Sequence, residues 1–157
     1  MKQKKLTVLI NDNLYQVFLF SSACTIPISF ATHSWFVISK KGELSRWEIL
    51  MIPRGNETSW KHLHLNFFPT TSGINILPFT KHKWTGKLLG YVEGNSKSYV
   101  KRMVELIESS PEKYSFNNRY SLLGPNSNSY IQWVLNQFPE SKLKLPINSF
   151  GKGYKFK

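Results

Sequence analysis

Residues 34–52, SWFVISKKGELSRWEILMI, carry the strongest fold signal in the chain. Two runs rich in aromatic and branched aliphatic residues flank a short polar segment, KKGE, that contains a glycine. Such runs favour strands, and a short glycine-containing segment between them is typical of a hairpin turn. The stretch therefore predicts two antiparallel strands, over residues 34–39 and 46–52.

Similar strand patterns occupy most of the first half of the chain. Apolar and β-branched residues cluster at 6–10, 15–20, 63–68 and 87–92. Proline and glycine predict loops at 52–59 and 68–73. The first half of the chain is therefore predicted to form a sheet.

Two amphipathic helices are predicted in the second half. Between residues 95 and 110, one helical face collects the apolar side chains Val100, Met103, Val104 and Ile107. Asn95 or Ser96 can cap this helix, and Pro111 follows its end. Residues 127–138 predict a second helix with the stripe Ile131, Val134, Leu135 and Phe138. Strands followed by helices indicate an α+β fold: a single domain over residues 1–157, with an antiparallel sheet packed against helices.

The composition fits a folded domain without a membrane span. The chain has 157 residues, of which 41% are hydrophobic and 15% aromatic. No apolar run approaches the roughly 20 residues that a transmembrane helix needs. The start, MKQKKLTVLINDNLYQVFLF, has the basic end of a signal peptide, but Asn-Asp-Asn at 11–13 interrupts its apolar part. We interpret it as two short strands joined by a turn and expect a cytoplasmic protein.

The net charge of +12 raises the question of an anionic partner. Seventeen of the 21 basic residues are lysine, whereas base recognition relies heavily on arginine. A lysine-rich background with basic ends explains the charge without a partner. The alternative is a platform for single-stranded nucleic acid, in which aromatic rings alternate with lysines. Its members would be Trp60, Trp84, Tyr91 and Tyr99 with Lys61, Lys81, Lys83 and Lys87.

The block GPNSNSY at 124–130 places four small polar residues directly before the second predicted helix. Asn126, Ser127 or Asn128 can each cap that helix. A side chain at a helix start also lies beside unpaired N–H groups, which stabilise an anion or an oxyanion. A nucleophile there needs a base, and His33 at the start of the predicted hairpin is the best candidate. Glu48, on the facing strand, could orient the imidazole.

Two other groups of residues offer competing sites. Cys24 lies in the apolar stretch SSACTIPISF and predicts a buried, inert thiol. His62 and His64 are two residues apart, and with His82 or His33 they could bind a metal. No carboxylate or thiol falls at a supporting spacing, so we predict neither a metal nor a cofactor.

Seven short motifs resemble those of an uncharacterised bacterial family, domain of unknown function 3750. They occur in the expected order from about Ala23 onward: HSW, RWE, GYVEG, YSFNNRY, GPNSNSYIQWV, LP and GKGY. The most specific is the Gly-Pro-Asn-Ser-Asn block with Trp133 six residues after Ser127. The family name implies no function.

The block YSLLGPNSNSYIQWVLNQF also resembles the nucleophile segment of circularly permuted papain-like folds, such as the deSUMOylating isopeptidase-like and lecithin:retinol acyltransferase-like groups. In those folds a histidine strand comes early and a cysteine opens a later helix. The resemblance places Ser127 at the cysteine position and His33 at the histidine position. It implies acyl transfer at an amide, ester or thioester.

Serine in place of cysteine leaves two interpretations open. Ser127 could attack with His33 as general base, Glu48 as orienter and helix-start N–H groups as an oxyanion hole. Alternatively, the domain has lost the reaction and only binds a ligand. In both cases we expect the pocket lining to include Asn126, Asn128, Trp35 and Tyr120. A peptide, a lipid or a cell-wall-like substrate would suit the surrounding aromatics.

Overall fold

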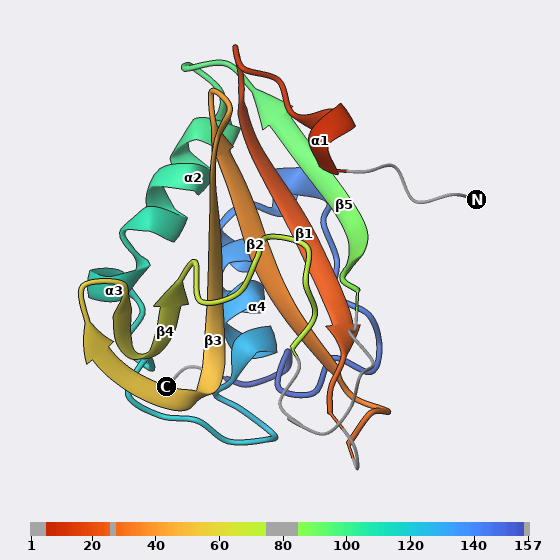
Figure 1. Ribbon diagram of the computed structural model, residues 1–157, viewed down its shortest axis with the longest axis vertical. Helices are drawn as coiled ribbons and strands as arrows, with labels where there is room; N and C mark the ends of the chain where they lie inside the picture. The colour runs from red at the N-terminus through yellow and green to blue at the C-terminus, as the bar shows by residue number, and fades with distance from the viewer. Residues whose placement is uncertain (1–5, 26–27, 75–84, 156–157) are drawn as a thin grey trace.

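The computed structural model describes residues 6–25, 28–74 and 85–155 (Figure 1). Its centre is a five-stranded antiparallel sheet in the order β4-β3-β2-β1-β5. The strands are β1 Tyr15–Ala23, β2 Thr32–Lys40, β3 Glu43–Asn56, β4 Ser59–Leu65 and β5 Lys87–Gly94. The predicted α+β class, with an antiparallel sheet packed against helices, is confirmed.

The predicted hairpin forms the middle of this sheet. Lys40 pairs with Glu43, so the loop between β2 and β3 is only Lys41 and Gly42. Both have positive φ, 53° and 93°, as a two-residue hairpin turn that matches the twist of the strands requires. A Cβ atom on Gly42 would lie 2.6 Å from the Asp12 carboxylate, so glycine is also needed for space.

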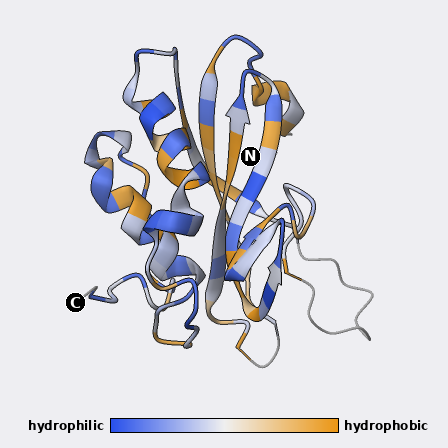
Figure 2. Cartoon of the chain, turned by 90° about the vertical axis from the view of Figure 1, so that its left-hand side faces the viewer, coloured by the Kyte–Doolittle hydropathy of each residue, from blue (hydrophilic) through white to orange (hydrophobic). Residues whose placement is uncertain are grey.

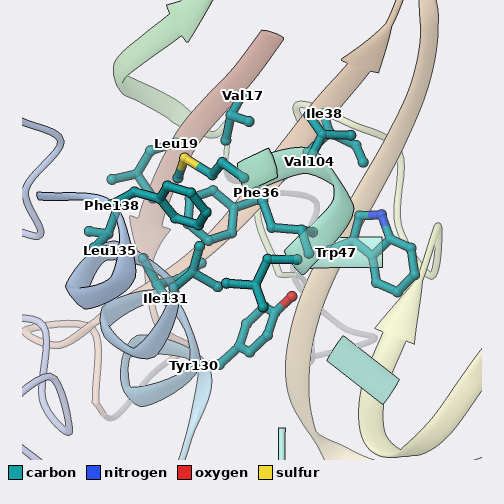
Figure 3. Close-up of a cluster of buried hydrophobic side chains, with 14 of the residues drawn as sticks. Val17, Leu19, Phe36, Ile38, Trp47, Val104, Tyr130, Ile131, Leu135 and Phe138 are labelled. Carbon is teal, nitrogen blue, oxygen red and sulfur yellow. The ribbon is translucent and has the colours of Figure 1, made fainter. Parts of the chain in front are cut away.

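The two faces of the sheet are covered differently, as the side view in Figure 2 shows. Helices α2 Tyr99–Glu108 and α4 Ser127–Gln137 pack on one face against alternate residues of the strands. Leu19 and Phe36 of the sheet contact this helical layer around Ile131 and Leu135 of α4 (Figure 3). The opposite face holds a smaller cluster: Leu6, Phe18, Phe20, Trp35 and Val37. The period of two along each strand therefore fills both faces with apolar side chains.

The first predicted strand is wrong, because residues 6–10 contribute a short helix, α1 Leu6–Leu9. Leu6 packs from this helix onto the second face of the sheet. A five-residue apolar run contains too few periods to separate a strand from a helix. The Asn-Asp-Asn turn therefore joins α1 to β1, and Leu14 N–H donates to Asn11 O within it.

Other element ends differ from the predicted ones. The β3–β4 hairpin is longer than predicted at its turn, since β3 continues through the predicted loop to Asn56 and β4 begins at Ser59 and ends at Leu65. The N-cap of α2 is Ser98, whereas Asn95 accepts from Lys97 N–H in the turn before it. Pro111 lies in the short helix α3 Ser110–Lys113, and the 3₁₀ turn η1 Pro139–Ser141 follows α4. Among the helices in the described ranges, none combines the length and apolarity of a membrane-crossing segment.

Candidate functional site

His33, the second residue of β2, and Glu48 of β3 form a buried pair. The β2–β3 ladder ends at the pair Phe36 and Trp47, so both residues lie beyond it, on the strand face opposite the helices. His33 Nε2 lies 2.8 Å from Glu48 Oε2, and both side chains are almost completely buried. The strands no longer hydrogen-bond to each other here, and this leaves room for a pocket beside the pair.

Arg46 joins the buried pair of His33 and Glu48 as a third residue, which the sequence analysis did not predict. It precedes Glu48 by two residues and so points to the same face of β3. Its guanidinium donates to Glu48 Oε2 at 2.7 Å, and to Pro69 O and Ser72 O in the loop after β4. The group also lies 4.1 Å from the Trp35 ring centroid. The spacing Arg-x-Glu was the signal that could have placed it in the site.

The two neighbours of Glu48 set its ionisation. Burial acts to raise the pKa of the Glu48 carboxyl, but the hydrogen bond and charge of His33, with the charge and hydrogen bond of Arg46, outweigh it and lower this pKa. A charged carboxylate only accepts hydrogen bonds, so His33 Nε2 must be the donor. In neutral His33 the lone pair then lies on Nδ1, where a general base needs it.

The start of α4 is organised by Asn126. Its Oδ1 accepts from the N–H groups of Asn128 and Ser129, and Ser129 Oγ accepts from Asn126 N–H, which completes a capping box. Asn126 is therefore the cap, and Ser127 and Asn128 are not. Within the described ranges the Ser127 N–H and hydroxyl have no hydrogen-bond partner. Ser127 is 3% exposed, so a ligand would have to meet these groups inside a pocket.

Asn128 ties the helix start to its surroundings. Its Nδ2 donates to Thr32 O at 2.8 Å and to Phe150 O at 2.9 Å. These bonds hold the start of α4 against the first residue of β2, next to His33. The side-chain Oδ1 of Asn128 is buried without a hydrogen-bond partner among the described residues.

The C-terminal segment of the chain contributes to this cap through Gly151. Its φ is +90°, its carbonyl accepts from Ser129 Oγ at 2.7 Å, and an added Cβ would lie 2.5 Å from the Asn126 amide. We expect Gly151→Ala to lower the free energy of unfolding by about 2 kcal/mol, because it strains the backbone and displaces the cap. Urea unfolding measures the loss. Gly153→Ala is the matched control, since nothing lies within 4 Å of its added Cβ; equal effects in the two variants would contradict the proposed contact.

His33 and Ser127 lie in the wall of one pocket, which has a cavity volume of about 90 Å³. Asn126, Asn128 and Tyr120 line it too, so five of the seven predicted site residues meet there. Glu48 lies behind His33. Trp35 does not line the pocket: it is fully buried, stacks on His33 at 5.7 Å between ring centroids and donates to Thr70 O. It therefore supports His33 and Arg46 from behind.

The same pocket contains the only cysteine of the sequence. Cys24 is half-buried rather than fully buried, and burial raises the pKa of its thiol to about 11. Burial, with the charge of Cys24 as a second cause, also raises the pKa of Tyr120 to about 12. Both groups are therefore protonated at neutral pH, and the predicted burial of the thiol is only partial.

The competing metal site is not assembled in the described part of the chain. His64 contacts Ser59 Oγ at 2.7 Å and Ile52 O at 2.8 Å, and His62 Nδ1 contacts Leu50 O at 2.8 Å. No group of three metal-ligating side chains occurs within residues 6–25, 28–74 and 85–155. His82, the other suggested ligand, lies outside these ranges.

The suggested aromatic and basic platform is dispersed. Trp60 and Lys61 lie on β4 and Tyr91 and Lys87 on β5, and these are the two opposite edge strands of the sheet. Trp60 stacks on Trp47, and Tyr91 stacks on Phe18. Tyr99 begins α2, and Trp84, Lys81 and Lys83 lie outside the described residues. The described members therefore do not form one continuous surface.

A scan of family models matches residues 14–154 to DUF3750, proteins of unknown function. The chain belongs to this family. The predicted membership is confirmed, and the match begins earlier than Ala23. Searches of curated proteins and of solved structures each found no match. The matched range of this DUF3750 chain contains His33, Arg46, Glu48 and Ser127.

Proposed function

We propose that the protein is an acyl-transfer enzyme, a hydrolase or transferase acting on an amide, ester or thioester, with a permuted papain-like cleft in which serine replaces cysteine. One observation carries the proposal. An imidazole from the early hairpin, hydrogen-bonded to a buried carboxylate, lines the same pocket as a hydroxyl at the first residue of a later helix. Nucleophile, base and orienting carboxylate recur in this relation in covalent acyl transfer.

The proposed reaction has two halves. Ser127 Oγ attacks the carbonyl carbon of the acyl group while its proton moves to His33 Nδ1. The bond from that carbon to the leaving group then breaks, and the imidazolium returns the proton to the leaving atom. A water or a second nucleophile attacks the acyl-serine in the same way, and the free hydroxyl of Ser127 is restored.

The Ser127 N–H supports the proposal as a donor to the negative charge that develops on the carbonyl oxygen. The Ser127 N–H is the first-turn N–H group of α4 that the capping box leaves unused. It lies at the positive end of the helix dipole, where a developing oxyanion is stabilised. The imidazolium formed during attack is stabilised by Glu48, whose carboxylate is charged in the folded protein.

A binding module without catalysis is the second candidate. A helix start and a histidine can hold a cysteine as a thiolate, but they cannot ionise a serine hydroxyl in the ground state. The replacement of cysteine by Ser127 therefore favours this candidate, and the pocket itself suits both.

Labelling with a fluorophosphonate separates the two candidates. We expect one adduct per chain, located on Ser127 by mass spectrometry, because the probe needs a serine activated by a base. Ser127→Ala should abolish the adduct, and His33→Asn should slow its formation by roughly a thousandfold. Ser96→Ala, at an exposed turn before α2, should label like the wild type. A folded wild type without an adduct would leave the binding module as the function.

A further inference from the structure

Most of the exposed apolar side chains of the described residues line this pocket or belong to the segments that line it. Seven of the nine large ones form what we call the apolar rim: Phe30, Met51, Ile52, Leu122, Leu123, Ile147 and Phe150. Val8 and Tyr91 are the two that do not belong to it. Scattered exposed apolar residues are ordinary, whereas a contiguous patch marks a surface that contacts something apolar.

The rim is continuous with the pocket wall. Met51, Ile52, Leu122 and Phe150 are both exposed and pocket-lining. Phe30 meets Phe150 edge to face, with ring centroids 5.9 Å apart. The neighbouring residue of Ile147, Asn148, donates to Phe30 O and accepts from Thr32 N–H. Loops from three parts of the chain thus meet at the lower end of the sheet in Figure 1.

The polar groups inside the pocket are mostly occupied by the protein itself. Asn126 Nδ2 donates to Ser121 O and Leu122 O, and Asn128 Nδ2 donates to Thr32 O and Phe150 O. Thr32 Oγ1 pairs with Ser149 Oγ. A peptide or a sugar would need many free donors and acceptors, whereas the pocket offers His33, Ser127 and Asn128 Oδ1, with the Tyr120 and Thr25 hydroxyls and the Cys24 thiol. Its remaining wall is largely apolar and includes Ile28, Leu50, Phe68 and Ile74.

The charged residues in the chain segments that contain the apolar rim are all basic. Residues 24–31, 50–55, 120–128 and 144–155 contain no aspartate or glutamate. They contain four basic residues: Arg54, Lys144, Lys152 and Lys155. Lys152 donates to Pro146 O, directly beside Ile147. Apolar segments that carry only basic charges are complementary to an anionic lipid surface, where apolar side chains enter the interface and cations meet the headgroups.

We infer that the substrate is a fatty acyl ester presented at an anionic lipid surface, onto which the apolar rim docks. This inference rests on the proposed acyl-transfer function and names its substrate class. A cavity of about 90 Å³ is smaller than the roughly 150 Å³ that accommodates benzene in an engineered core. It holds the carbonyl end, while the acyl chain lies along the rim. Ser127 Oγ bonds to the carbonyl carbon, the ester C–O bond breaks, and the lipid alcohol leaves with the proton from His33.

Vesicle co-sedimentation tests the docking surface. Wild type should bind vesicles of phosphatidylcholine with phosphatidylglycerol, and bind pure phosphatidylcholine vesicles less. Phe30→Ser, Leu123→Ser and Ile147→Ser combined should weaken binding at least roughly tenfold. These side chains are 62%, 72% and 96% exposed, so their replacement spares the core. Val8→Ser, 73% exposed and away from the rim, is the matched control.

A second pair of variants tests the charge component. Lys144→Gln with Lys155→Gln should weaken binding to the anionic vesicles, whereas Lys97→Gln with Lys113→Gln, also exposed lysines, should leave it unchanged. Equal binding by the triple rim variant and the Val8→Ser control would overturn the docking surface, as would wild type failing to bind either vesicle.

Labelling rates with probes of different length test the acyl chain. A dodecyl fluorophosphonate should label wild type at least roughly tenfold faster than an ethyl one, because its chain buries apolar surface along the rim. Equal rates would overturn the lipid substrate and leave the acyl-transfer proposal standing. A folded wild type that binds the anionic vesicles but that neither probe labels would instead overturn acyl transfer and leave a lipid-binding module.

Discussion

Replacing Glu48 with glutamine is expected to lower the free energy of unfolding by about 3–5 kcal/mol at pH 7, the range measured when one partner of a buried ion pair is removed. Glu48 accepts from both His33 and Arg46 through one oxygen, and Arg46 and Glu48 are fully buried. Glutamine keeps the shape of the side chain but leaves the Arg46 guanidinium without a counter-charge. Chemical denaturation with urea measures the loss.

The stability loss caused by Glu48→Gln should also depend on pH, in a direction set by the pKa of Glu48. The pKa of Glu48 is lowered in the folded protein, so its contribution to stability is complete above the unfolded-state pKa of about 4.3. It is lost as the pH falls through the lower folded-state pKa. The difference between wild type and Glu48→Gln should therefore be large at neutral pH and shrink on acidification below about pH 4. A difference that stays constant would show that Glu48 is not ionised in the fold.

Glu108→Gln is the matched control for both measurements. Glu108 pairs with Lys40 at 3.0 Å, but both side chains are substantially exposed. Surface pairs of this kind contribute less than about 1 kcal/mol, since water already solvates each charge. An effect of Glu48→Gln as small as that of the control would contradict the picture of a desolvated charge cluster.

Regular patterns in the sequence predict the sheet and the two long helices well. The β2–β3 hairpin and α4 each contain several periods of their apolar repeat, so that one atypical residue does not change the prediction. Residues 6–10 contain too few periods, and the extension of β3 to Asn56 runs through Pro53 and Gly55, which normally indicate a loop.

The site divides into a local and a long-range part. The meeting of His33 and Glu48 follows from the hairpin, because its register, continued past Phe36 and Trp47, makes them diagonal neighbours on one face. Arg46 belongs to the same face and could have been included. The approach of Ser127 to this pair depends instead on contacts such as Asn128 to Thr32, which span 96 positions in the chain. No periodic pattern in the sequence predicts that these residues lie close together. Only the order of motifs in a resembling fold suggested that Ser127 approaches His33. The apolar rim depends on similar contacts between loops and was not predicted.

Placing a cysteine at the start of α4 should produce an unusually reactive thiol. In Ser127→Cys, prepared together with Cys24→Ser so that one thiol is present, we expect the new thiol pKa to lie below the ordinary value of about 8.5. The start of α4 and the imidazole of His33 both favour the thiolate. At pH 6, iodoacetamide should react roughly tenfold faster than with an ordinary thiol, after allowing for the lower nucleophilicity of a less basic thiolate.

The reference is Ser96→Cys in the same Cys24→Ser background, which places a thiol on an exposed turn. Adding His33→Asn to the Ser127→Cys variant should raise the pKa of the new thiol most of the way back to the ordinary value. This comparison tests the geometry of the pocket whether or not the natural serine reacts, because a thiolate reports the local field without any substrate. Identical pH profiles at the two positions would mean that His33 and the start of α4 do not act on the same atom. The pocket would then have the residues of an acyl-transfer site without their arrangement, and a ligand-binding role would be the better account of this domain.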